Sequence, residues 1–169
     1  MVKKSALIFL AVWFALLLFM PKAELYHTFE EVLDKQDIRL NEKSIDEGLF
    51  TFTLKDVTIY VKGIALAHVD ELDFFTLLFY SSLDATNLTV DEVLHSKVPS
   101  FTKEASFTHM IFTPLTVSID ANGSFGMIEG SFNGMDNAVR IDFLEVGDVG
   151  MIQPFLIKDE KGWFYEKSF

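Results

Sequence analysis

Residues 50–61 decide the fold: they read Phe-Thr-Phe-Thr-Leu-Lys-Asp-Val-Thr-Ile-Tyr-Val. In the first half apolar residues alternate with threonine, which is the spacing of a half-buried β-strand. Beyond Lys55-Asp56 the apolar residues change parity. Because successive side chains of a strand point to opposite faces, the change predicts a bulge, a sharp twist or a tight turn there. The alternating residues are Phe50, Phe52 and Leu54 before the change, and Val57, Ile59 and Val61 after it.

Short alternating segments recur along the rest of the chain at intervals of about 8–12 residues. Such spacing predicts a mainly β protein built on a curved antiparallel sheet, either left open as a groove or closed as a sandwich. Phe74–Tyr80 is apolar without alternation, and it is interpreted as one or two helical turns between strands. The predicted strands are Ile64–Leu72, Leu83–Val90, Phe107–Phe112, Leu115–Ile119, Phe125–Phe132, Val139–Phe143, Pro154–Lys158 and Trp163–Ser168.

The N-terminal segment, residues 1–23, is predicted to be a transmembrane signal-anchor. Lys3 and Lys4 precede sixteen uncharged residues that end at Pro21. As a helix these would span about 24 Å, which is short of a hydrocarbon core of about 30 Å, although local thinning and snorkelling lysines can offset the difference. A cleaved signal peptide is the alternative. The side chains expected in the bilayer include Ala6, Leu10, Trp13, Leu17 and Met20.

Charge is distributed unevenly on either side of this segment. All 25 acidic residues lie at or beyond Glu24, where only 11 basic residues are found, so this part has a net charge of −14. Basic residues before an apolar helix place the N-terminus in the cytoplasm and the remainder across the membrane. An acidic body repels nucleic acid, which excludes a nucleic-acid partner to first order.

Between the anchor and the sheet, residues 24–37 are predicted to form a short amphipathic helix. Thr28 and Glu31 have the spacing of a capping box. Residues 38–169 then form the β-rich domain.

Catalytic and metal-binding patterns are not found. Cysteine is absent, which excludes disulfides and thiolate chemistry. The four histidines have no metal-ligand spacing, and the glycines do not form a phosphate-binding loop. The sequence therefore predicts a non-enzymatic protein without metal or cofactor. The histidines are His27, His68, His95 and His109.

Apolar residues are in excess, and eighteen of them are phenylalanine. They could fill an ordinary core, or they could line a concave surface that binds acyl chains or packs on a partner. The residues predicted to line such a surface are Phe50, Phe52, Leu54, Phe107 and Ile111.

Residues 63–90, with the order strand, short Leu-Leu-containing turn and strand, resemble the recurring unit of AsmA-like envelope proteins and of type II secretion system protein N. Residues 48–58 are similar to the stretch that leads into this unit. Residues 122–132 and 139–146 resemble later hairpins of the secretion protein. Lipopolysaccharide-export proteins share the topology and are less similar.

The resemblance implies a bacterial inner-membrane helix and a periplasmic, strongly curved sheet with an apolar inner face. It also implies non-catalytic work in the envelope, either by binding phospholipid or lipopolysaccharide or by assembling with secretion or export subunits. A purely structural role, in which an open sheet edge accepts a partner's strand and no lipid binds, is the alternative.

Overall fold

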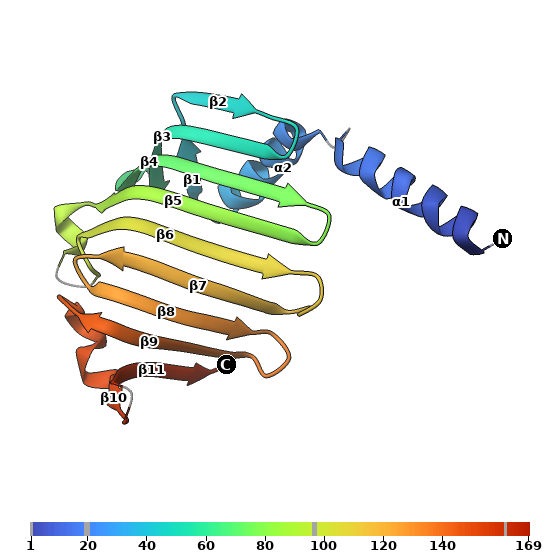
Figure 1. Cartoon of the computed structure of the whole chain (residues 1–169). Coiled ribbons are helices and arrows are strands. Elements are labelled where there is room, and N and C mark those ends of the chain that lie inside the picture. Colours follow the sequence, from blue (N-terminus) through green and yellow to red (C-terminus); the bar gives the residue numbers. More distant parts are fainter. Residues whose placement is uncertain (1, 19–20, 96–97, 161) are drawn as a thin grey trace.

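The computed structural model describes residues 2–18, 21–95, 98–160 and 162–169. Over these residues the chain forms two N-terminal helices and then eleven strands, with two short 3-10 helices in the connections (Figure 1). The helices are α1 (Val2–Leu18), α2 (Lys22–Asp34), η1 (Glu92–Leu94) and η2 (Gly150–Phe155). The strands are β1 (Ile38–Asn41), β2 (Ser44–Glu47), β3 (Thr51–Val61), β4 (Ile64–Leu77), β5 (Tyr80–Val90), β6 (Phe101–Met110), β7 (Thr116–Gly123), β8 (Gly126–Asn133), β9 (Ala138–Val146), β10 (Ile157–Lys158) and β11 (Trp163–Ser168).

All the described strands belong to one open antiparallel sheet. Its order is β1-β3-β4-β5-β6-β7-β8-β9-β11-β10, and β2 pairs with β3 beside β1. Each of β3 to β9 pairs with its sequence neighbour, so the predicted meander and the mainly β fold class are confirmed. The sandwich alternative is wrong, since the described strands form one sheet and no second sheet over it.

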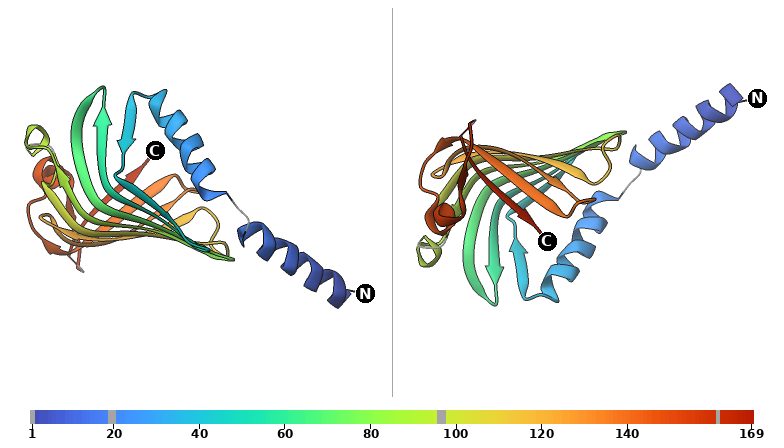
Figure 2. Two further views of the ribbon diagram at one scale, coloured as in Figure 1. Left: turned by 90° about the horizontal axis from the view of Figure 1, so that it is seen from above. Right: turned by 90° about the horizontal axis from the view of Figure 1, so that it is seen from below.

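The sheet curves strongly, as the two end-on views in Figure 2 show. Irregular positions lie side by side in the central strands. Asp56 of β3 and Asn87 of β5 both have a φ of 52°, and the Asn87 side chain donates a hydrogen bond of 2.9 Å to Asp70 of β4 between them. The register of β6 against β7 shifts next to this line, between Thr102 and Glu104. Such irregularities increase local twist, and the one predicted at Lys55-Asp56 is confirmed.

The strand registers separate apolar and polar residues onto the two faces. One cross-strand row consists of Phe52, Phe74, Leu83, Phe107, Ile119, Gly130, Ile141 and Tyr165. A second row on the same face consists of Leu54, Leu72, Ala85, Ala105, Ala121, Ile128, Phe143 and Trp163. We call these the two apolar rows. Helix α2 packs on this face, which is the concave one (Figure 2).

The cross-strand row that lies between the two apolar rows points to the convex face and is mostly acidic. Its members are Thr53, Asp73, Asp84, Ser106, Asp120, Glu129, Asp142 and Phe164. Hydroxyl groups donate to these carboxylates: Ser106 bonds Asp84 at 2.6 Å, and Thr53 bonds Asp73. Five of the acidic residues that look scattered in the sequence therefore share one row on the convex face of the sheet.

Helix α2 covers one end of the concave face. It begins at Lys22 and ends at Asp34, so the predicted amphipathic helix exists but starts earlier. The predicted capping box is wrong for this reason: Thr28 lies inside the helix, where its hydroxyl donates to the Glu24 carbonyl at 2.9 Å. The Tyr26 ring packs 5.5 Å from the Phe52 ring, at the centre of the main core cluster.

Residues 74–80 do not form helical turns, contrary to the sequence prediction. β4 continues to Leu77, and β5 starts at Tyr80 after a tight turn in which Leu78 has a φ of 44°. Periodicity alone cannot separate a short apolar strand from a buried helical segment. Here pairing of Phe74 with both Phe52 and Leu83 gives the extended form two cross-strand partners.

The predicted transmembrane anchor is wrong. In the described parts of the chain no helix is long and apolar enough to cross a membrane. α1 has 17 residues and includes Lys3 and Lys4, so its uncharged part spans only about 21 Å against a hydrocarbon core of about 30 Å. The inferred single-pass placement in a bacterial inner membrane, with a cytoplasmic N-terminus and a periplasmic domain, is overturned with it.

Of the residues assigned to the anchor, four lie in α1 and Met20 lies outside the described residues. Leu10 is exposed on α1, and Trp13 stacks on Phe9 with their ring centroids 6.3 Å apart. The two others in α1 are Ala6 and Leu17.

Candidate functional site

The concave face forms an apolar trough that stays partly open to solvent. The two apolar rows contain no charged side chain, and seven strand spacings separate β3 from β11, which corresponds to a length of about 33 Å. Phe107, in the middle of the first row, is 37% exposed. Most of its neighbours in the row are only partly buried. Partly exposed apolar side chains arranged in one continuous surface are typical of a ligand or partner site.

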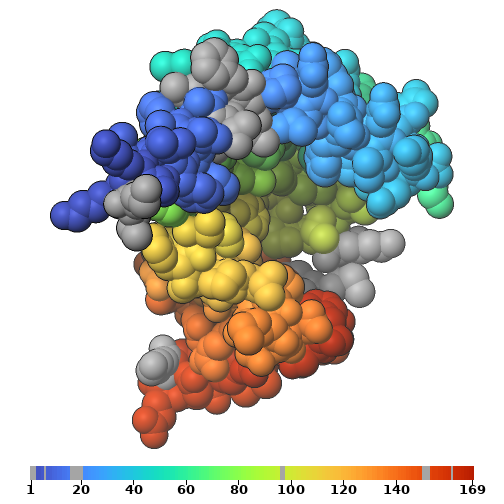
Figure 3. Space-filling view, turned by 90° about the vertical axis from the view of Figure 1, so that its right-hand side faces the viewer, coloured from blue at the N-terminus to red at the C-terminus, as the bar shows by residue number. Residues whose placement is uncertain are grey.

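The trough deepens into a cavity of about 300 Å³ beneath α2. In Figure 3 the concave face is hollowed below α2, drawn in light blue, and green strands form the back of the hollow. This volume lies at the lower end of the range for small-molecule sites. Helix α2 contributes Lys22, Leu25, Tyr26 and Phe29 to the lining, and the sheet side contributes Phe50, Phe52, Phe74 and Thr76.

A third cross-strand row, polar at its two ends and apolar in the middle, borders the two apolar rows on one side. The third cross-strand row of the concave face begins with Thr76, Ser81 and His109 and ends with Lys167. Its middle members, Val117, Phe132 and Val139, are apolar. The concave face therefore has an apolar floor with a partly polar border, and Thr76 brings this border to the cavity.

Two polar side chains of α2, Tyr26 and Lys22, fix the helix over the cavity. The Tyr26 hydroxyl donates to Glu42 Oε2 at 2.8 Å. Burial and the nearby Glu42 carboxylate raise the pKa of Tyr26 above its ordinary value of about 10. At the start of the helix, Lys22 Nζ donates to the carbonyl oxygens of Gly48 and Leu49, the second at 2.6 Å.

Replacing Tyr26 with Phe is expected to lower the free energy of unfolding by about 1 kcal/mol at neutral pH, because a hydrogen bond is lost. Urea denaturation measures the difference. Above pH 10 the wild type should lose stability, since the unfolded tyrosine releases its proton there while the folded one retains it. The difference between the proteins should therefore shrink as pH rises from 8 to 11. A difference that stays constant over this range would contradict the assignment.

The predicted lining residues fall into three places. Phe50 and Phe52 line the cavity, and Phe107 lies further along the trough. Leu54, the β3 member of the second row, is only 1% exposed and belongs to the main core cluster. Ile111 lies beyond the end of β6, in the β6–β7 connection, and is exposed.

Sequence reasoning missed the contribution of α2 to the cavity. Leu25 and Phe29 are four residues apart and line it together with Tyr26. Their helical spacing was the available signal. It shows one apolar face of a helix, but it does not show which part of the sheet that face covers.

Other polar groups of the sheet are engaged with one another. Arg140 forms ion pairs with Asp142 at 2.8 Å, Asp159 at 3.3 Å and Glu166 at 3.5 Å, and its guanidinium lies 4.3 Å from the Phe164 ring centre. A hydrogen bond with Asp73 raises the pKa of Glu71. Among the residues that the structure describes, no group of three or more His, Asp or Glu side chains could hold a metal ion.

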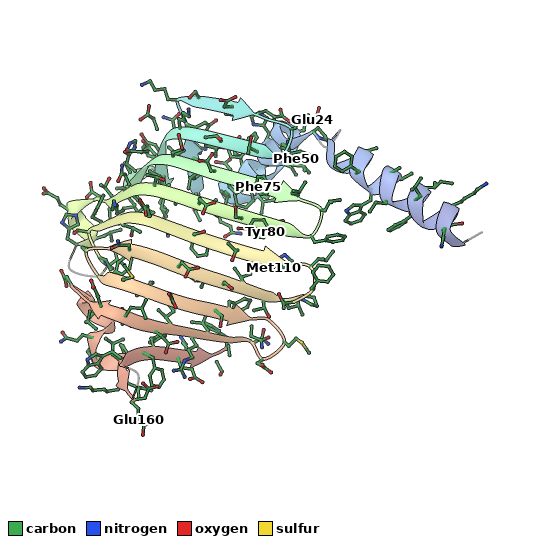
Figure 4. The ribbon with its side chains drawn as sticks, in the orientation of Figure 1. Glu24, Phe50, Phe75, Tyr80, Met110 and Glu160 are labelled. Atoms are coloured by element: carbon green, nitrogen blue, oxygen red, sulfur yellow. The ribbon has the colours of Figure 1, made fainter. Side chains whose placement is uncertain are left out.

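The convex face also carries a small apolar patch. Phe75, Tyr80 and Met110 lie near one end of β4, β5 and β6 (Figure 4). The rings of Phe75 and Tyr80 are 6.0 Å apart, and Tyr80 is paired with Met110 across the strands. This patch is separated from the trough by the sheet itself, so it does not add to the site.

The described residues therefore form an open, strongly curved antiparallel sheet with an apolar concave face and a helix over one end of it. Comparison of the chain with protein-family models, curated proteins and solved structures gave no significant match.

Proposed function

We propose that the protein binds acyl chains along its concave face and catalyses no reaction. The observation that carries this proposal is the pair of apolar rows, which cross eight strands, consist mostly of partly exposed side chains and lead into the cavity under α2. A flexible apolar chain can follow such a surface, and burial contributes roughly 25 cal/mol per Å² of apolar area removed from water.

The separation of charge on the two faces supports the same ligand class. The convex row is acidic, whereas the two apolar rows have no charged member. An acyl chain that binds in the trough would therefore not remove water from an ionised side chain of these rows, which would be costly. Acyl chains, as found in phospholipid or lipopolysaccharide, are also what the sequence resemblance to envelope proteins implies.

Native mass spectrometry of the full chain, purified from cells in mild detergent, tests the proposal. We expect adducts with the masses of acyl-containing molecules, which survive detergent exchange and are recovered by lipid extraction. A protein that is consistently free of such adducts, and that does not take up added fatty acid or phospholipid, would contradict it.

A structural docking role is the second candidate. Within the described residues, β10 pairs only with Trp163 and Phe164 of β11, so the outer edge of β11 from Tyr165 onward has no strand beside it. An open edge can accept a strand from a partner, such as a subunit of a secretion or export complex. This role predicts co-purification of that subunit with a protein free of lipid.

A further inference from the structure

We propose that the cavity under α2 takes the head-group end of a single-chain anionic amphiphile, a long-chain fatty acid, and that the ammonium group of Lys22 binds its carboxylate. This inference rests on the proposed acyl-chain function and names the ligand class for it.

Lys22 presents an uncompensated positive charge at this cavity. Its Nζ donates to two backbone carbonyls, those of Gly48 and Leu49. An ammonium group has three donors, so one N–H is left for a ligand. In the described parts of the chain no carboxylate lies within ion-pair distance of Nζ. The two carbonyl oxygens position the ammonium group of Lys22 but do not neutralise its positive charge.

The rest of the lining favours a ligand with one charged end. Leu25, Phe29 and Phe50 are apolar, and the Tyr26 hydroxyl is occupied by Glu42. Lys22 is the first residue of α2, where the helix dipole adds to the attraction for an anion. A cationic head group would be repelled at the same position. The Thr76 hydroxyl, on the polar border of the trough, also lines the cavity and can donate a second hydrogen bond.

The size of the cavity favours one chain over two. About 300 Å³ is close to the smallest volume that ligand sites use. The two apolar rows continue from Phe52 and Leu54 along the sheet, so a single chain that starts at Lys22 can leave the cavity through the trough. A two-chain phospholipid would need to place a second chain beside it beneath α2.

The test compares two ligands of the same chain length, palmitate and hexadecanol, by displacement of a fluorescent apolar probe from the full chain. The wild type is expected to bind palmitate about tenfold more tightly, since a charge-assisted hydrogen bond is worth that much or more. Lys22→Met keeps the apolar part of the side chain and should bind the two ligands equally. Lys22→Arg should restore the preference, and Lys62→Met, in the distant β3–β4 turn, should leave it intact.

The outcomes separate this inference from the function it rests on. If the wild type binds both ligands equally, or if Lys22→Met keeps the preference for palmitate, the head-group inference is overturned and acyl-chain binding stands. If neither ligand binds to the wild type, the proposed function itself fails. Because Lys22→Met also loses the hydrogen bonds to Gly48 and Leu49, the deciding quantity is the ratio of the palmitate and hexadecanol affinities within each variant, and circular dichroism melting establishes that the variant is folded.

Discussion

Phe107→Asp is expected to abolish acyl-chain binding while the protein remains folded. Phe107 lies in the middle of the first apolar row, between Leu83 and Ile119, and is 37% exposed. An aspartate there can stay hydrated in the free protein, so the fold tolerates it. A bound chain would have to remove that water from the carboxylate, which costs several kcal/mol. The affinity for palmitate or for an apolar probe should therefore fall by about a hundredfold or more.

The neighbouring residue supplies the matched control. Thr108 lies on the same strand but faces the convex side, opposite Ser82. Thr108→Asp adds the same charge one residue away and should leave the affinity within about twofold, because the sheet separates it from the chain. Equal losses in the two variants would show that binding does not use the concave face. Circular dichroism melting of both variants establishes that they are folded.

Leu54→Ala is expected to lower the free energy of unfolding by about 3 kcal/mol. Leu54 is 1% exposed and packs between β3 and β4 in the cluster that also contains Val57 and Val69. Truncation leaves a space that this layer cannot easily close, because the strands on either side are fixed by their hydrogen bonds. Urea denaturation measures the change. The dependence of the free energy of unfolding on urea concentration is compared between the variant and the wild type.

Leu144→Ala is the control for this substitution. Leu144 is in β9 and is 54% exposed, so its truncation should change the free energy of unfolding by no more than about 0.5 kcal/mol. If the free energy of unfolding fell by similar amounts in the two variants, the placement of the core between α2 and strands β3–β5 would be contradicted.

Much of the sheet could be predicted because alternation is a local property of the chain. The parity change at Lys55-Asp56 is visible in the sequence, and the structure places a left-handed Asp56 there. The open form of the sheet was harder to foresee. It depends on where β11 and β10 pair after the chain leaves β9, and no short segment encodes that pairing.

The candidate site was predictable only in part, for the same reason. Phe52 and Leu54 have the same alternation as Phe107, yet the first two are buried and the third is open to solvent. The difference arises because α2 and the bent ends of β3–β5 cover one end of the concave face only. Ile111 follows the parity of Phe107, but β6 ends before it at Met110, so it lies in a connection.

The two largest errors in the predictions from sequence concerned the bounds of the N-terminal helix and the structure of the apolar run at residues 74–80. The N-terminal prediction counted sixteen uncharged residues, whereas the described helix α1, Val2–Leu18, includes both lysines at its start and Met20 lies outside the described residues. The helical interpretation of residues 74–80 failed because an apolar run of seven residues fits a strand equally well. In both cases the information that decides the outcome is the length of the element and its pairing, which the local pattern does not contain.

Methyl NMR with a spin-labelled fatty acid shows whether an acyl chain binds along the concave face. The methyl groups of Ile119, Ile128 and Ile141 lie on the two apolar rows, whereas those of the exposed residues Leu144 and Ile157 lie outside them. A nitroxide on the chain broadens signals from nearby methyl groups. If the chain lies along the concave face, the signals of the three row residues lose intensity as the ligand is added and those of Leu144 and Ile157 do not. Loss of intensity at Leu144 and Ile157, with the row residues unchanged, would contradict it.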